Sequence, residues 1–125
     1  KYFYKEIDGR ERIIDWEFAS EDVDLLAQSV YYSNVMITTV STLTIDSAAI
    51  DRPVIGIRFD AIPHCSKQHS ILKIIDLHDH YRDLERTGGV RLVKNIDELI
   101  SALNLYLKNP ELDKEGRKQI REDFR

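Results

Sequence analysis

The sequence predicts an α/β protein in which short buried strands of a parallel sheet alternate with helices. Three apolar runs at residues 35–38, 54–58 and 90–93 carry this prediction, because each is rich in Val, Ile or Leu and too short for a helix. Segments with helical periodicity separate the runs. Parallel neighbours need a long crossover connection, usually a helix, so the alternation favours a parallel sheet over hairpins.

The N-terminal part of the chain is the least regular. Residues 12–16 (RIIDW) predict a short strand, and Asp8-Gly9 predicts a turn. Ser20 is expected to be the N-cap of a helix, because acids follow it in the first turn, where the helix dipole favours negative charge. Apolar residues at helical spacing carry this helix to about Ser33-Asn34.

The middle of the chain continues the alternation. A short helix is expected over residues 41–51, ended by Pro53, and a strand over residues 54–59. Residues 60–70 (DAIPHCSKQHS) form a polar loop of a length that is typical of functional loops. Residues 71–75 are expected to be extended.

Clear helix signals mark the C-terminal part. A helix is expected from Asp76 or Asp79 through Arg86, closed by Gly88-Gly89. Asn95 with Glu98 resembles a capping box before an amphipathic helix that Asn109-Pro110 ends. The charged tail from Asp113 onward is expected to be a helix lying across the surface.

The composition and net charge exclude some classes of function and limit the size of the folded unit. At 125 residues, with 42% hydrophobic and 32% charged residues, the chain suits one folded domain. A net charge of −4 argues against a general nucleic-acid binder. The single cysteine, Cys65, cannot form an internal disulfide, which fits the cytoplasm. The chain lacks an initiating Met and ends on EDFR, so we expect an excised piece of a longer protein.

Two hydroxyl residues, Ser41 and Thr42, come after a predicted strand and begin a predicted helix. In open parallel sheets, ligands bind beyond the carboxyl ends of the strands. Helix N-termini offer N–H groups and a positive dipole end, which suit phosphates. A GxGxxG motif and a Walker lysine are both missing, so a standard NAD site or P-loop is excluded.

Asp46 lies four residues after Thr42, about one turn along the same helical face. A carboxylate would repel a phosphate but can accept hydrogen bonds from the hydroxyl pair of a ribose. A simpler interpretation stays open from spacing alone: Ser41 caps the helix, and Asp46 is a solvated helix residue.

The segment Tyr31–Asp60, YYSNVMITTVSTLTIDSAAIDRPVIGIRFD, resembles the donor-binding domain of GT-B glycosyltransferases. It is most similar to bacterial surface-polysaccharide transferases and CDP-glycerol glycerophosphotransferases, and more distantly to UDP-GlcNAc 2-epimerase. The segment His80–Asp113 also resembles the end of such domains. The resemblance implies a Rossmann-like, three-layer parallel sheet that is part of a GT-B C-terminal domain.

The resemblance also implies roles for residues. Ser41 and Thr42 fall where the family binds the donor diphosphate, and Asp46 falls where a Glu usually bonds the ribose. Asp is one methylene shorter than Glu. The usual Asp of the family's Tyr-Ser-Asp is Asn34 here. The catalytic base is expected on an acceptor domain outside this chain, so no catalytic residue is assigned and the piece alone is expected to be inactive.

Other residues carry weaker signals. Arg58 and Asp60 end a predicted strand on the ligand side, where they suit either a binding cleft or a surface ion pair. His80 is the first residue of a His-Tyr pair found in these transferases, which suggests the cleft, although packing on the sheet is equally expected. The other histidines lack the carboxylates or cysteines of a metal site, so neither a metal nor a cofactor is predicted.

Together these features predict the donor-binding portion of a glycosyl- or glycerophosphotransferase in surface-polysaccharide biosynthesis. Its partners would be a nucleotide-activated sugar or polyol and, through the missing domain, a glycan or lipid-linked acceptor at the inner face of the membrane. Two alternatives remain: a nucleotide-sugar epimerase of the same fold, and a non-catalytic flavodoxin-like or receiver-like module.

Overall fold

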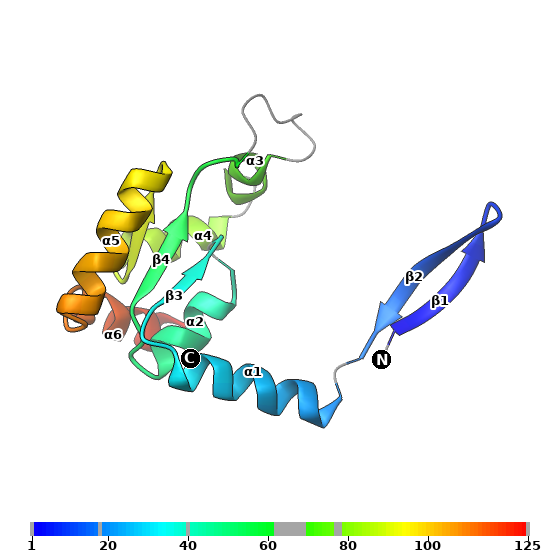
Figure 1. Cartoon of the computed structure of the whole chain (residues 1–125), viewed down its shortest axis with the longest axis horizontal. Coiled ribbons are helices and arrows are strands. Elements are labelled where there is room, and N and C mark those ends of the chain that lie inside the picture. Colours follow the sequence, from blue (N-terminus) through cyan, green and yellow to red (C-terminus); the bar gives the residue numbers. More distant parts are fainter. Residues whose placement is uncertain (1, 18, 40, 62–69, 77–78, 125) are drawn as a thin grey trace.

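The computed structural model describes residues 2–17, 19–39, 41–61, 70–76 and 79–124. Strands and helices alternate after an initial hairpin (Figure 1). The elements are, in order, β1 (Tyr2–Ile7), β2 (Arg10–Trp16), α1 (Ser20–Tyr32), β3 (Met36–Thr38), α2 (Leu43–Ala49), β4 (Val54–Ile57), α3 (Ile71–Asp76), α4 (Asp79–Arg86), β5 (Val90–Val93), α5 (Ile96–Lys108) and α6 (Lys114–Asp123). No helix among the described residues is both long and apolar enough to cross a membrane.

The three predicted buried strands form one parallel sheet in the order β3-β4-β5. Thr38 lies opposite Gly56, and Val54 lies opposite Val90, so the carboxyl ends of the strands point to the same edge. This pairing confirms that the three apolar runs are neighbouring parallel strands. The mixed α/β class is confirmed with it.

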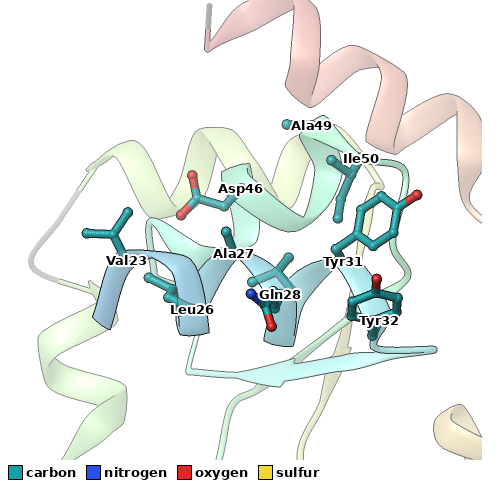
Figure 2. Close-up of a pocket in the computed structure, with 10 residues that line it drawn as sticks. Val23, Leu26, Ala27, Gln28, Tyr31, Tyr32, Asp46, Ala49 and Ile50 are labelled. Atoms are coloured by element: carbon teal, nitrogen blue, oxygen red, sulfur yellow. The ribbon is translucent and has the colours of Figure 1, made fainter. Parts of the chain in front are cut away.

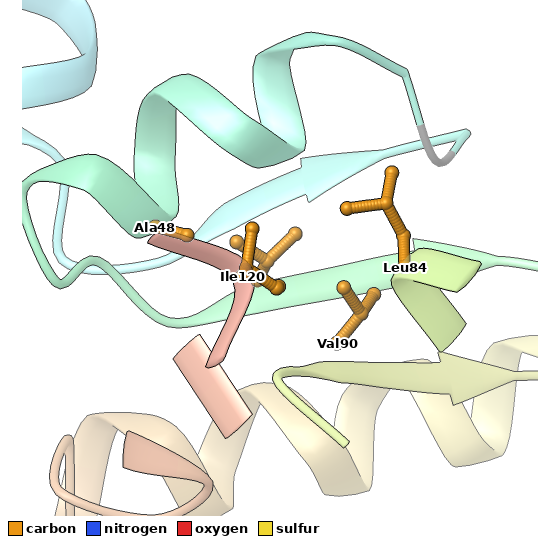
Figure 3. Close-up of a cluster of buried hydrophobic side chains, with 5 residues drawn as sticks. Ala48, Leu84, Val90 and Ile120 are labelled. Atoms are coloured by element: carbon orange, nitrogen blue, oxygen red, sulfur yellow. The ribbon is translucent and has the colours of Figure 1, made fainter. Parts of the chain in front are cut away.

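Helices cover both faces of the sheet. On one face, α2, α4 and α6 pack against β4 and β5 through a cluster of buried side chains, four of them labelled in Figure 3 (Ala48, Val54, Leu84, Val90, Ile120). On the other face, α5 contributes Ala102 and Tyr106, which pack on Ile55 and Val93. Alternate residues of β4 therefore enter opposite clusters, as the pleat of a strand buried on both faces requires.

The β1–β2 hairpin is antiparallel and stands at the far end of α1 from the sheet (Figure 1). Asp8 and Gly9 make its turn with φ of 54° and 71°. Two positive φ values in a two-residue loop are typical of the turns that match strand twist, and Asp-Gly is favoured there. The predicted turn and the strand over residues 12–16 are both confirmed, although β2 begins at Arg10.

The ends of the helices test the predicted caps. Asn95 Oδ1 accepts the Glu98 N–H at 2.9 Å, and Glu98 Oε2 accepts the Lys94 N–H at 2.7 Å, so the capping signal before α5 is confirmed. The predicted N-cap Ser20 is wrong by one residue: Ala19 is the N-cap and Ser20 is the first residue of α1. The Asp22 carboxylate accepts the Ala19 N–H at 3.1 Å. The backbone N–H at the start of α1 therefore has a partner although no hydroxyl caps the helix.

One further expectation is wrong, and two are correct in kind but differ in detail. Residues 71–75 form helix α3 rather than an extended segment, because the Asp60 carboxylate accepts the Ile71 N–H at the start of the helix. The helix expected over residues 41–51 is present as α2 but is shorter: it ends at Ala49, and Asp51 takes a left-handed conformation with φ of 58° before Pro53 is reached. The helix expected in the charged tail is confirmed as α6, and most of its residues are exposed, but Arg117 and Ile120 are fully buried on its inner side.

Candidate functional site

The carboxyl ends of β3 and β4 place four predicted site residues at one edge of the sheet. Ser41 and Thr42 come after β3 and lead into α2, while Arg58 and Asp60 follow β4. Since Thr38 is paired with Gly56, the two chain segments leave the sheet side by side. The structure therefore brings both predicted groups to the edge where open parallel sheets bind ligands.

Ser41 is half-buried and its hydroxyl is used within the fold. Its Oγ lies 3.1 Å from the hydroxyl of Thr38 and accepts the Leu43 N–H at 3.3 Å. Its carbonyl accepts the Thr44 N–H at 2.9 Å. These bonds join the end of β3 to the first turn of α2. Ser41 thus has the capping role that its sequence position also allowed, and its hydroxyl is held in a defined orientation.

Thr42 is exposed and takes helical backbone angles directly before α2. Its carbonyl accepts the N–H groups of Ile45 and Asp46 at 2.9 and 3.2 Å, and its side chain makes no capping hydrogen bond. The exposed Thr42 side chain therefore lies at the positive end of the helix dipole, without a capping role. Among the described residues, the buried hydroxyl of Thr44, two positions on, has no hydrogen-bond partner.

Asp46 is exposed on α2 and lines an apolar groove between α1 and α2 (Figure 2). The groove has a volume of about 580 Å³. Figure 2 shows the Asp46 carboxylate on the α2 side, opposite Val23 and Leu26 of α1. The other lining residues are Ala27, Gln28, Val30, Tyr31, Tyr32, Ala49 and Ile50. Asp46 is the carboxylate in an otherwise uncharged lining.

Tyr31 and Tyr32, at the C-terminal end of α1, line one end of the groove. Their rings meet edge to face with centroids 5.1 Å apart. The Arg52 guanidinium lies 5.7 Å from the centre of the Tyr31 ring and donates a hydrogen bond to the Tyr31 carbonyl at 2.6 Å. This contact is a cation–π arrangement that orients the ring. Aromatic walls and one carboxylate are typical of small-molecule sites of 300–1,000 Å³.

Sequence reasoning missed this groove. The sequence indicated only that Val23, Leu26, Ala27 and Val30 recur at helical spacing, which predicts a helix with one apolar face. Only Val30 is buried, whereas the Val23 and Leu26 side chains are 51% and 41% exposed. The periodicity correctly marked one face of α1, but it cannot tell whether another element covers that face.

Arg58 faces α4 rather than open solvent. Its guanidinium forms an ion pair with Glu85, and the two side chains are 24% and 20% exposed. Its backbone N–H donates to the Val93 carbonyl at 2.8 Å, which joins the ends of β4 and β5. Arg82 and Arg86 line the same surface hollow. The ion-pair interpretation of Arg58 is thus confirmed, and its place in a binding cleft stays a prediction.

Asp60 holds the ends of the polar loop together. Its Oδ2 accepts the Ser70 hydroxyl at 2.7 Å, and its Oδ1 accepts the Ile71 N–H at 2.8 Å. Both carboxylate oxygens are therefore engaged at the start of α3. The loop itself, with His64, Cys65 and His69, lies outside the described residues, as does His78.

His80 occupies the first turn of α4, but its side chain is outside the described part, so its predicted place in the cleft is untested. Asn34, expected at a turn, lies between α1 and β3. Within the described ranges, no three His, Cys, Asp or Glu residues gather in a way that could hold a metal ion.

Comparison with known proteins adds no relative. Family models, curated proteins and solved structures were all searched, and none of them matches this chain.

Proposed function

We propose that this chain is the donor-binding portion of a glycosyl- or glycerophosphotransferase, with a Rossmann-like sheet of the GT-B type. The single observation that carries the proposal is the position of Asp46. It lies about one helical turn from Thr42, the residue directly before α2 at the carboxyl edge of the sheet, and it also lines the apolar groove. A nucleoside diphosphate has the matching order of groups: phosphates, ribose and a flat apolar base.

Each part of the donor has a complementary part of the site. The diphosphate lies at the start of α2, where Thr42 presents its hydroxyl and the helix dipole favours negative charge. Asp46 accepts hydrogen bonds from the ribose hydroxyls, about one turn away. The base lies in the groove against α1, where Val23 and Leu26 supply apolar surface. The resemblance of Tyr31–Asp60 to GT-B donor domains supports the same assignment.

The chemistry of this portion is the stabilisation of a leaving group. In transfer from a nucleotide-activated donor, negative charge grows on the diphosphate as the bond to the sugar or polyol phosphate breaks. Fixed N–H groups and hydroxyls at a helix N-terminus stabilise such charge without reorganisation. The base that activates the acceptor, and the membrane-side acceptor itself, belong in this proposal to another domain. The epimerase alternative uses the same donor site and differs in that second domain.

Calorimetric titration of the chain tests the proposal with uridine, cytidine and their diphosphates. Asp46→Ala should weaken binding of nucleosides and nucleotides alike, by roughly 1.5–3 kcal/mol for hydrogen bonds to a charged group. Asp46→Asn should lose less, because an amide oxygen still accepts one hydrogen bond. Thr42→Val should spare the nucleosides and weaken only the ligands that carry phosphate.

Asp97 provides the matched control, because it is an exposed acid in the first turn of α5, outside the groove. Asp97→Ala should bind every ligand as the unchanged chain does. Thermal unfolding of each variant separates loss of binding from loss of fold. Equal affinity of the unchanged chain and Asp46→Ala for all four ligands would contradict the proposal and leave Asp46 as a solvated helix residue.

A further inference from the structure

The two strands of the β1–β2 hairpin pack against no other helix or strand of the described chain to any substantial extent. They contact each other extensively. Figure 1 shows the hairpin standing clear of the sheet at the end of α1. An isolated two-stranded hairpin is only marginally stable in water, and a third strand or a packed face is needed to hold it. The hairpin therefore needs a surface that the rest of this chain does not provide.

The three-stranded sheet lacks a neighbouring strand on one side of β3 in the described residues. In the described residues β3 pairs with β4 on one side only, so its other edge presents unpaired N–H and C=O groups. The strand, Met36-Ile37-Thr38, contains none of the charged or proline residues that usually protect an edge. Ile37 is paired with Ile55 of the α5-side cluster, yet its side chain is 41% exposed.

Helix α5, which packs on β4 and β5, also has an uncovered side. Ile96, Ile100 and Leu107 follow one another at helical spacing along α5, and each is more than half exposed. Leu107 shares a hollow with Asn34 and Pro53, which precede β3 and β4. The described chain thus has both an open strand edge at β3 and an open apolar side of α5.

The accessible surface of the chain agrees with a large missing contact. It measures 9,004 Å², whereas a folded monomer of this mass exposes roughly 6,900 Å². The surplus of roughly 2,000 Å² exceeds the roughly 800 Å² that each partner buries in a standard interface. Part of this surplus is the hairpin itself, which makes the hairpin the natural element to bury.

We propose that two copies of this chain exchange their hairpins, each hairpin adding to the β3 edge of the other copy. The sheet of each subunit would grow from three strands to five, and each hairpin would gain the third strand that it lacks. Exchange of an identical element is a low-cost route to a symmetric dimer. Helix α1 connects the hairpin to β3, and its 13 residues span about 20 Å, which separates the hairpin from the sheet of its own chain.

Mixed disulfide formation tests the exchange. One population carries Ile13→Cys on β2 and a mass-tagged population carries Ile37→Cys on β3, both with Cys65→Ser to remove the native thiol. After mixing and mild oxidation, the disulfide between positions 13 and 37 should exceed the 13–13 and 37–37 products. It must join two chains, because neither chain carries both cysteines. A 13–37 product at or below the statistical share would overturn the proposal.

Light scattering of the unchanged chain gives the second readout, and a dimer is expected. Ile37→Lys should weaken the dimer about tenfold or more, since a charge would be buried at the new pairing. Leu105→Lys is the control, because Leu105 is similarly exposed, at 45%, on the opposite side of α5. Circular dichroism checks that both variants are folded. A monomer at all concentrations overturns the proposal, as does a double variant, Ile13→Cys with Ile37→Cys, that closes within one chain.

Discussion

Arg117, a fully buried residue of α6, donates its Nε–H to the Asp51 carboxylate at 2.9 Å. The same guanidinium donates to the carbonyls of Leu112 and Pro110 at 2.6 and 2.9 Å. Asp51 follows α2, the helix whose other end carries Thr42. One side chain near the C-terminus therefore fixes the position of the helix on which the candidate donor site is built.

Replacement of this guanidinium should be costly. Arg117→Lys should lower the free energy of unfolding by about 3 kcal/mol, because one ammonium cannot reach three acceptors that the planar guanidinium satisfies together. Arg121→Lys is the matched control: Arg121 is 28% exposed and donates one bond to the Ala48 carbonyl. That change should cost less than about 1 kcal/mol. Urea denaturation measures both, and equal losses would show that burial of Arg117 is unimportant.

The same ion pair predicts a loss of stability in acid. Desolvation alone would raise the pKa of Asp51, but the hydrogen bond and charge of Arg117, with the charges of Lys114 and Arg121, outweigh it and hold the pKa below its ordinary value of 3.8. A depressed carboxyl pKa stabilises the fold above the unfolded pKa, and this contribution is lost as pH falls through the folded pKa.

Asp51→Asn isolates this contribution. The difference in unfolding free energy between the unchanged chain and Asp51→Asn should be largest near neutral pH and should shrink below pH 3.8. Urea denaturation over a pH series measures it. A difference that stays constant through the acid range would mean that the Asp51 charge contributes nothing.

Two glycines allow α6 to approach the start of β5. A Cβ built on Gly89 would lie 2.5 Å from the Gly116 carbonyl carbon and 2.6 Å from the Arg117 nitrogen. Gly89→Ala should therefore destabilise the fold by about 3 kcal/mol, at the upper end for overpacking, since only backbone could move. Gly88→Ala meets no atom within 4 Å but has φ of 69°, so about 1 kcal/mol of left-handed strain is expected. Thermal unfolding that ranked Gly88→Ala as the worse variant would contradict the close contact.

Tyr106 should ionise only when the protein unfolds. Burial, followed by its hydrogen bond to Asp113 at 2.6 Å, raises the pKa of Tyr106 well above its ordinary value of 10.0. A raised pKa stabilises the fold below the unfolded pKa, so stability should fall as pH rises above 10. Spectrophotometric titration should show one tyrosine ionising late, together with loss of ellipticity.

Tyr106→Phe should remove that late group and cost about 1 kcal/mol at neutral pH. The cost is small because Asp113 keeps its contacts with Arg91 Nε and Nη2 at 3.0 and 2.7 Å. If all tyrosines of the unchanged chain titrated together near their ordinary pKa, the buried hydrogen bond would be contradicted.

Much of the fold was predictable because its signals are local. Short apolar runs fill β3, β4 and β5, since strands buried on both faces carry no polar alternation. Asn95 with Glu98 marks the start of α5 within four residues of sequence. In the candidate site, Ser41, Thr42 and Asp46 could be placed together for the same reason, since all three belong to one strand–helix junction.

The incorrect predictions involve contacts between distant residues. Helix α3 begins where Asp60 accepts an N–H from eleven residues further on, a bond that no local pattern marks. Helix α6 has a charged sequence, yet Arg117 and Ile120 are buried because Gly89 and Gly116 allow close packing. A buried arginine cannot be distinguished from a solvated one until its partners are known.

By itself the sequence determined the α/β class, the parallel strands and the junction that carries Ser41, Thr42 and Asp46, because periodicity and capping act over a few residues. Tertiary structure alone decided which of those surfaces are covered. In the tertiary structure Asp46 lines a groove between α1 and α2. Both carboxylate oxygens of Asp60 accept hydrogen bonds at the start of α3. The hairpin and the free edge of β3 pair with no further strand of the described chain. Burial depends on which elements meet in space, and apolar spacing in a sequence specifies a face without specifying its partner.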